Sequence, residues 1–238
     1  MTYHAIECYN NIILSAKGVF TMHGVLLIHG FAGSRDEVRP LCDFLTARGY
    51  PVLMPSLSGH EDTKGALSRA TRFDWIDDVS AAYTRLAKTC DEITVIGFSM
   101  GGLLAVNLFE KYKFARLVTI NTPIYYWDIR RIFYNLRDDF KTYSRKYVRE
   151  GVNKPLRALW QFQRILTQSK SAFSHITCPT LVIQVQDDDT THRRSGDYIY
   201  SHVCGEREIM RPKHGGHVIL QSASAPEILK KIGEFLSL

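Results

Sequence analysis

Two kinds of hydrophobic pattern alternate along this chain. Short, continuous apolar runs rich in β-branched residues are typical of strands that are buried on both faces of a sheet. Between these runs lie longer stretches in which apolar residues recur every three or four positions, as they do along one face of an amphipathic helix. Strands that alternate with helices predict an α/β fold with a mostly parallel, doubly wound sheet flanked by helices.

The two patterns give the expected elements in order. Strands are predicted at residues 24–28, 51–54, 93–96, 115–120, 180–185 and 208–210. Helices are predicted at residues 38–49, 74–88, 103–111, 196–202 and 226–236. Two β-leaning runs near the N-terminus, 5–9 and 11–15, are expected to form an antiparallel pair at the edge of the sheet. The polar stretch 55–65 is expected to be a long loop.

Residues 124–175 interrupt this alternation. The stretch is rich in aromatic residues interleaved with charges, and Gly151 and Pro155 divide it into two parts that are expected to be helical. It is much longer than the roughly 4–6 residues that usually connect elements in compact domains. We therefore expect a small helical cap at 124–175, inserted into a single α/β domain that spans residues 1–238 and has its core at 1–123 and 176–238.

The charge of the chain changes this picture little. The formal net charge is +6, from 30 Lys and Arg against 24 Asp and Glu. Basic residues are densest between Arg130 and Arg164, where acids and aromatic residues separate them. Such mixing favours solvated helix faces over a surface for nucleic acid or anionic lipid.

The cysteines and the apolar runs bear on compartment and cofactors. The five cysteines are scattered, odd in number and form no C-x-x-C pair, which argues against a disulfide scaffold or a structural zinc site. The first residues lack the basic and apolar regions of a signal peptide. No apolar run approaches the ~20 residues that span a bilayer. We therefore expect a cytoplasmic protein.

The first candidate for chemistry is the segment 93–102. A predicted strand at 93–96 is followed by Gly-Phe-Ser-Met-Gly at 97–101, which matches G-x-S-x-G, and then by a predicted helix. Strand, tight turn and helix are the context of a nucleophile elbow, in which the serine adopts a strained backbone conformation and its hydroxyl projects outward. The alternative is a helix-capping serine, here Ser99, in a glycine-rich turn.

A serine hydroxyl needs a base to take its proton and an acid to orient that base. In the elbow fold, the serine comes first in the chain, then Asp or Glu, then His. Asp187, Asp188 and Asp189 follow the strand at 180–185, and His214 and His217 precede the last helix, so all lie at one edge of the predicted sheet. We favour His217, which follows two glycines, and Asp188, with Asp187 second and Asp189 third.

Hydrolysis of an ester also needs hydrogen-bond donors for the oxyanion of the tetrahedral intermediate. The backbone N–H of Met100, directly after Ser99, is one candidate. The N–H of Phe31, in the loop after the strand at 24–28, is the other. His29 in the same loop does not have the chain position of the base and is expected to be structural.

The motifs together resemble the α/β-hydrolase superfamily. The resemblance covers almost the whole chain from Gly24 and is strongest to small bacterial carboxylesterases and monoacylglycerol lipases with a short cap. The segments that carry it are 26–33, 59–60, 97–102, 179–188 and 216–219.

The resemblance implies a role for each matching residue. It implies that Ser99 is acylated, that the loop of Phe31 contributes to the oxyanion hole, that His217 is the base and that Asp188 is the acid. The sequence departs from the family pattern at the triple aspartate, and at 190–191, where two threonines replace a more usual apolar residue.

The expected function is that of a serine carboxylesterase. It would hydrolyse small to medium acyl esters through an acyl-enzyme, without cofactor or metal. The residues expected to contact the substrate are Gly30, Tyr125, Trp127, Trp160 and Val218. For most of the cap aromatics, ordinary packing between cap helices is the alternative. The expected partner is a small-molecule ester, with no nucleic acid and no stable membrane insertion, and a homodimer stays open.

Two further classes of function stay open. One is another triad hydrolase of the same fold: a monoacylglycerol lipase, a thioesterase, or an enzyme that cleaves an amide or a carbon–carbon bond. The other is a ligand-binding protein that keeps the fold without turnover. Epoxide hydrolases and haloalkane dehalogenases are disfavoured, because those relatives carry aspartate where this chain has Ser99.

Overall fold

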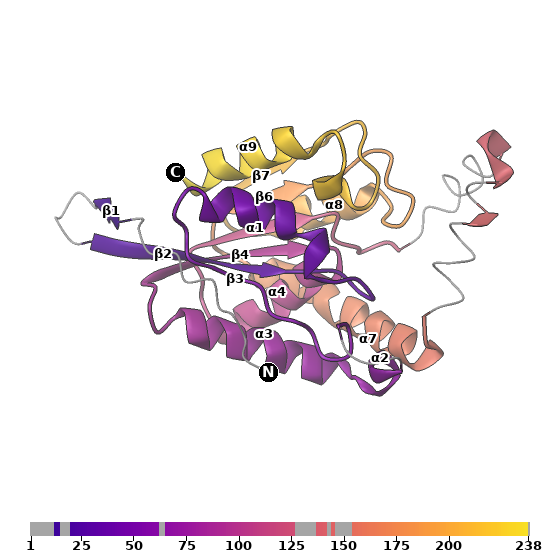
Figure 1. The fold of residues 1–238 in the computed structure, drawn as a ribbon, viewed down its shortest axis with the longest axis horizontal. Coiled ribbons are helices and arrows are strands. Elements are labelled where there is room, and N and C mark those ends of the chain that lie inside the picture. The colour runs from indigo at the N-terminus through magenta and orange to yellow at the C-terminus, as the bar shows by residue number, and fades with distance from the viewer. Residues whose placement is uncertain are drawn as a thin grey trace.

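The computed structural model describes residues 12–14, 20–61, 65–126, 137–141, 144–145 and 154–237. In these residues the chain forms a twisted sheet with the strand order β1-β2-β4-β5-β6-β7, and β3 pairs beside β2 (Figure 1). The strands are β1 (Ile12–Leu14), β2 (Phe20–Ile28), β3 (Val52–Leu53), β4 (Glu92–Phe98), β5 (Arg116–Ile120), β6 (Thr180–Ile183) and β7 (Arg207–Met210). β1 is antiparallel to β2, and the other pairings of these strands are parallel.

Helices cover both faces of the sheet. They are α1 (Arg39–Thr46), α2 (Ala66–Arg69), α3 (Arg72–Leu86), α4 (Met100–Lys111), α7 (Leu156–Ala172), α8 (Arg194–His202) and α9 (Ala225–Leu236). Short 3₁₀ turns are η1 (Arg35–Glu37), η2 (Phe173–His175) and η3 (Ile219–Gln221). Figure 1 shows α1 and α9 on one side of the sheet and α3, α4 and α7 on the other. The predicted α/β fold with a mostly parallel, doubly wound sheet is confirmed.

The alternation of side chains along β2 joins the two layers. Val25 and Leu27 pack in the cluster that includes α1 and α9, whereas Leu26 and Ile28 pack in the cluster that includes α3, α4 and α7. All four side chains are fully buried. Burial of such a side chain contributes roughly 1.5–3 kcal/mol, so a strand buried on both faces stabilises both layers at once.

The structure differs from the expected elements mainly at their ends. β2 begins at Phe20 rather than at Gly24, and α4 begins at Met100, directly after Ser99. The run at 11–15 contains β1, which pairs with β2, while the run at 5–9 lies outside the described residues. The short helix α2, immediately after the polar loop, was not predicted.

The second helical part expected within 124–175 corresponds to α7, which begins directly after Pro155. Its buried face carries Ala158, Phe162, Ile165 and Ser169, at the spacing of one helix face. Asn107 of α4 donates a hydrogen bond to Ser169 at 2.6 Å, which links α7 to the core. The first helical part falls largely outside the described residues, so the cap as a unit stays a prediction.

The turn between β4 and α4 is closely packed against the sheet. A Cβ atom on Gly97 would overlap the backbone of Gly101 and Gly102, and one on Gly101 would overlap the carbonyl group of Ile28 at the end of β2. The absence of side chains at these two glycines therefore lets α4 start against the sheet.

Replacing Gly101 by alanine should destabilise the fold. The added methyl group has to displace backbone rather than a flexible side chain, so we expect a loss of about 3 kcal/mol in the free energy of unfolding. Gly65→Ala is the matched control, because its Cβ would meet no atom closer than 3.9 Å and the cost is that of a φ of 90°, about 1 kcal/mol. Urea unfolding measures both, and equal losses would contradict this account of the turn.

Candidate active site

Ser99 lies at the junction of β4 and α4 in a backbone conformation that side-chain residues rarely adopt. Its φ is 51° and its ψ is −120°. Its amide donates a hydrogen bond to the carbonyl oxygen of Ile120, the last residue of β5, at 2.8 Å. A residue in such a region is held there by its surroundings, and the turn directs its side chain away from the strand.

A hydrogen-bonded chain of three side chains begins at Ser99. The Ser99 Oγ atom lies 3.0 Å from Nε2 of His217, and Nδ1 of His217 lies 2.8 Å from Oδ2 of Asp188. A carboxylate can only accept, so the proton on Nδ1 faces Asp188 and Nε2 is left to accept the proton of the Ser99 hydroxyl. The Asp188 side chain is fully buried and that of His217 is 17% exposed.

The three adjacent aspartates point to different partners. Asp188 accepts the backbone N–H groups of Thr190 and Thr191 through Oδ1, at 2.8 and 2.9 Å, and so presents Oδ2 to His217. Asp187 instead accepts the N–H of Gly216 at 2.9 Å, and its other oxygen lies 3.3 Å from His214. The side chain of Asp189 contacts the Thr190 hydroxyl at 3.4 Å.

The acids around His217 change its protonation. Burial alone would lower the pKa of His217, but the charge and hydrogen bond of Asp188, with further contributions from Glu37 and Asp189, raise the pKa above its ordinary value. The imidazole is therefore a stronger base than an isolated histidine, and its protonated form is stabilised.

Asn121, which follows β5, connects the loops that carry His217 and Asp188. Its side-chain NH₂ donates to the carbonyl oxygens of His217 at 2.7 Å and Gly216 at 3.3 Å. Its side-chain oxygen accepts the N–H of Val185 at 2.9 Å. Asn121 is fully buried with a φ of 47°, so one side chain fixes the relative position of two loops.

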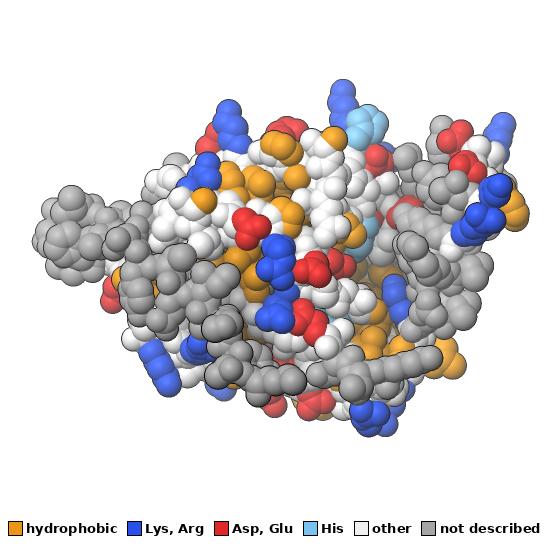
Figure 2. All heavy atoms as spheres, viewed as in Figure 1, with side chains coloured by type: hydrophobic (Ala, Val, Ile, Leu, Met, Phe, Trp, Pro, Cys, Tyr) orange, Lys and Arg blue, Asp and Glu red, His pale blue; other side chains and the backbone are white. Residues whose placement is uncertain are grey.

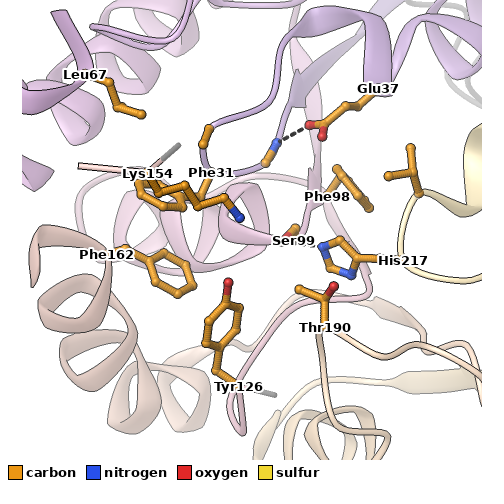
Figure 3. Close-up of a pocket in the computed structure, with 13 residues that line it drawn as sticks. Phe31, Glu37, Leu67, Phe98, Ser99, Tyr126, Lys154, Phe162, Thr190 and His217 are labelled. Atoms are coloured by element: carbon orange, nitrogen blue, oxygen red, sulfur yellow. Dashed lines mark hydrogen bonds between the residues drawn. The ribbon is translucent and has the colours of Figure 1, made fainter. Parts of the chain in front are cut away.

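The loop after β2 forms another wall of the site. Gly30 and Phe31 line the same cavity as Ser99 (Figure 3). Met100 follows Ser99 as the first residue of α4, where backbone N–H groups have no partner within the helix. The two amides that we assigned to an oxyanion hole thus belong to elements on two sides of Ser99.

His29 occupies a structural position in this loop. Its Nδ1 lies 2.9 Å from the carbonyl oxygen of Gly30, and its Nε2 accepts the N–H of Leu57 at 3.3 Å. Burial, together with the neighbouring charge of His60, lowers the pKa of His29 to about 4. The ring therefore stays neutral at pH 7 and ties the loop after β2 to the loop after β3.

A cavity of about 420 Å³ opens above Ser99 and His217 (Figure 3). The residues that line it are Gly30, Phe31, Ala32, Glu37, Leu67, Phe98, Ser99, Tyr126, Lys154, Phe162, Thr190, His217 and Val218. The expected contact residues Gly30 and Val218 belong to this set. Tyr125 and Trp160 are 38% and 54% exposed and lie outside it, and Trp127 lies outside the described residues.

Of the lining residues that sequence reasoning missed, Phe162 could have been found from the sequence. Phe162 lies on the apolar face of α7, four residues after Ala158 and three before Ile165, and its ring stacks on Phe31 with 5.0 Å between centroids. Trp160 is on the opposite face, beneath the guanidinium of Arg164. Glu37 carries no comparable signal, because its carboxyl group reaches the site only after η1 folds back over the loop.

Three further observations on the part of the chain that the structure describes concern metal ions, membranes and surface charge. It contains no cluster of three His, Cys, Asp or Glu that could hold a metal ion. It also contains no helix that is long and apolar enough to cross a bilayer. On the face drawn in Figure 2, Lys and Arg side chains are interspersed with Asp and Glu and do not form a patch of one sign.

Similarity to known proteins agrees with this geometry. A family model described as the α/β-hydrolase fold matches residues 25–203. The chain is 29% identical over 226 residues to a thermostable monoacylglycerol lipase from Bacillus sp. (strain H-257), with 90% of each chain covered. It is 24% identical over 233 residues to a carboxylesterase from Bacillus subtilis (strain 168), with 91% of this chain and 95% of the relative covered. A solved structure reported for the metagenome-derived lipolytic enzymes LipS and LipT has a TM-score of 0.78 at 25% identity, covering 91% of this chain and 94% of the other.

The buried His29 should make stability depend on pH. Below pH 6.5 the unfolded chain binds a proton at this residue, whereas the folded protein does so only near pH 4, so stability should fall as the pH drops from 6.5 to 4. The loss is up to about 3 kcal/mol. Urea unfolding at pH 7 and pH 4.5 should show a smaller difference for His29→Gln than for wild type. His175→Gln, at an exposed ring, is the control, and equal pH dependence in all three proteins would refute the assignment.

Proposed function

Because this chain belongs to the α/β-hydrolase family, we propose that it hydrolyses carboxylic esters with Ser99 as nucleophile, His217 as base and Asp188 as the acid that orients the base. The observation that carries the proposal is the continuous hydrogen-bonded chain from Ser99 through His217 to Asp188 at the floor of a cavity. A hydroxyl, an imidazole and a buried carboxylate in this order are suited to acyl transfer.

In the first half of the reaction, the Ser99 oxygen attacks the carbonyl carbon of the ester while His217 Nε2 takes the hydroxyl proton. The carbonyl oxygen becomes an oxyanion, which the backbone N–H groups of Phe31 and Met100 would stabilise, each by ~3–4 kcal/mol of barrier. His217 then gives its proton to the alcohol oxygen. The carbon–oxygen bond breaks, the alcohol leaves, and the acyl group remains on Ser99.

In the second half, a water molecule takes the place of the alcohol. His217 removes one proton from the water as its oxygen attacks the acyl carbon, and a second oxyanion forms in the same position. The proton returns to the Ser99 oxygen as the acyl–enzyme bond breaks, and a carboxylic acid leaves. Throughout both halves, Asp188 holds the imidazole orientation and stabilises its protonated form.

The size and lining of the cavity support acyl groups of small to medium length. A volume of about 420 Å³ is at the lower end of the range for ligand pockets. Phe31, Leu67 and Phe162 give it an apolar wall across from His217 (Figure 3). An acyl chain of a few carbons would desolvate against these side chains.

Monoacylglycerol hydrolysis is the second candidate function. The relative from Bacillus sp. (strain H-257) bears that name, and the cavity also contains polar groups from Tyr126, Lys154 and Thr190 that could hydrogen bond with glycerol hydroxyls. The chemistry at Ser99 is the same for both candidates. Location in the cytoplasm stays a proposal that follows from the sequence, and assembly as a homodimer stays open.

Replacing Ser99 by alanine should abolish hydrolysis of both p-nitrophenyl butyrate and monobutyroylglycerol, with a loss of roughly 10⁴-fold or more in kcat. Circular dichroism should be unchanged. A fluorophosphonate probe should form an adduct on Ser99 in wild type and none in the variant. Turnover that persists in Ser99→Ala would refute the nucleophile, and a wild-type protein without turnover or adduct would be a ligand-binding homologue.

The acid can be identified by three asparagine variants. Asp188→Asn should lower kcat by roughly 10³–10⁴-fold, because the amide no longer holds the required imidazole tautomer. Asp187→Asn keeps an acceptor oxygen for Gly216, and we expect it and Asp189→Asn to stay within a few fold of wild type. Steady-state kinetics on p-nitrophenyl butyrate measure all three. A larger loss of kcat in Asp187→Asn or Asp189→Asn than in Asp188→Asn would identify that residue as the acid instead of Asp188.

A further inference from the structure

Glu37 places a second carboxyl group in the candidate active site. It is the last residue of η1, and its side chain lines the cavity together with Ser99 and His217. Its Oε2 atom accepts the backbone N–H of Gly30 at 3.1 Å, as the dashed line in Figure 3 shows. The carboxyl group is thus bonded to the residue directly before Phe31.

The loop is closely packed around this carboxyl group. A Cβ atom on Gly33 would overlap the Glu37 carboxyl group. A Cβ atom on Gly30 would lie 3.2 Å from Oε2 of Glu37 and 3.2 Å from Cβ of Ser99. Gly30 therefore lies between Ser99 and Glu37, and a side chain at Gly33 would displace the Glu37 carboxyl group.

The turn that carries Glu37 is itself held at both ends. Ser34 caps η1, since its hydroxyl accepts the N–H of Asp36 at 3.2 Å and its carbonyl accepts the N–H of Glu37 at 3.1 Å. From the other side, the amide of Gln221 in η3 donates to the carbonyl of Asp36 at 2.9 Å. The position of the carboxyl group is therefore set by the fold and not by one flexible side chain.

Charges near the site act on Glu37 and His217 together. Burial raises the pKa of Glu37 above its ordinary value. The hydrogen bond from Gly30 and the charges of His217 and Lys154 act in the opposite direction and offset part of this rise. The acids that act on His217 are Asp188, which lies 2.8 Å from its Nδ1, and Glu37 and Asp189, which act through their charges. Asp187 is bonded to Gly216, the residue before His217. An ionised Glu37 therefore favours the protonated form of His217.

We propose that Glu37 is a positioning residue for the hydrolysis: its carboxylate fixes the Gly30–Phe31 backbone for oxyanion binding and stabilises the imidazolium that His217 becomes in the transition state. The proposal rests on the proposed function of Ser99 and His217. An oxyanion hole is effective only when its donors are held in place before the charge develops. Glu37 does not contact the reacting atoms and acts through Gly30 and His217.

The two roles can be separated by two variants. Glu37→Gln keeps an oxygen that can accept the Gly30 N–H but removes the charge, whereas Glu37→Leu removes both. Asp36→Asn is the matched control, because it removes a neighbouring exposed carboxylate that pairs with Arg39 at 3.0 Å. We expect kcat to fall roughly 3–10-fold in Glu37→Gln and roughly 30–100-fold in Glu37→Leu, below the loss of a whole oxyanion donor. The KM values of both Glu37 variants should stay within about twofold of wild type, and so should kcat and KM of the Asp36→Asn control.

The pH profile gives the readout that a merely structural role would not move. The acid limb of kcat/KM reports the pKa of the base in the free enzyme. Without the negative charge of Glu37, the pKa of His217 should drop, so the limb in Glu37→Gln should shift to lower pH. The limb in Asp36→Asn should not shift.

Three outcomes would overturn the proposal. The first is wild-type kinetics in both Glu37 variants. The second is a fall in kcat with the acid limb unchanged and the free energy of unfolding lowered in proportion. The third is a loss confined to KM. If Glu37→Leu does not fold, Glu37→Gln alone decides. Failure of the proposed function would look different, because turnover would then survive in Ser99→Ala. The Glu37 proposal is tested separately, by comparing the Glu37 variants with the active wild type.

Discussion

The site depends on one backbone constraint, the left-handed conformation of Ser99. Such a conformation costs roughly 1–3 kcal/mol and persists only where the surroundings impose it. Here the surroundings are the hydrogen bond from Ser99 to Ile120 and the contact of Gly101 with the end of β2. Because β4 lies between β2 and β5 in the sheet, both neighbours that hold the turn are themselves buried strands. The burial of the central strands thus supplies the free energy that keeps the serine in position.

The rest of the site is built from residues that the parallel strands bring to the same edge of the sheet. The loop after β2 supplies Phe31, the end of β5 supplies Asn121, and the turn after β6 supplies Asp188. Asn121 has a special place among them, because its amide bonds to the loop of His217 and to Val185 at the end of β6. The base and its acid are therefore held in register through one buried side chain as well as through their own hydrogen bond.

Much of this could be predicted from the sequence, and the limits have physical causes. The apolar runs predicted the fold, and the motifs, in their order along the chain, pointed to Ser99 and His217. The same motifs carried the resemblance to the family, which the family model confirms. The choice among Asp187, Asp188 and Asp189 depends on which way each side chain leaves a turn, and the amides of Thr190 and Thr191 that orient Asp188 are not visible as a pattern. Trp160 was expected to contact the substrate, but it does not line the described cavity. Phe162, on the buried face of α7, lines the cavity instead.

The position of His217 next to Ser99 also determines which charges act on its imidazole. A base at the floor of a cavity is partly desolvated, and desolvation alone would lower the pKa of His217 and weaken it as a base. The carboxylate of Asp188 outweighs that effect through direct contact, and Glu37, which lines the same cavity, adds its charge. These acids stabilise the protonated form of the imidazole, while Nε2 faces Ser99. Since Glu37 is also bonded to Gly30, a single carboxyl group couples the electrostatics of the base to the shape of the loop that would hold the oxyanion.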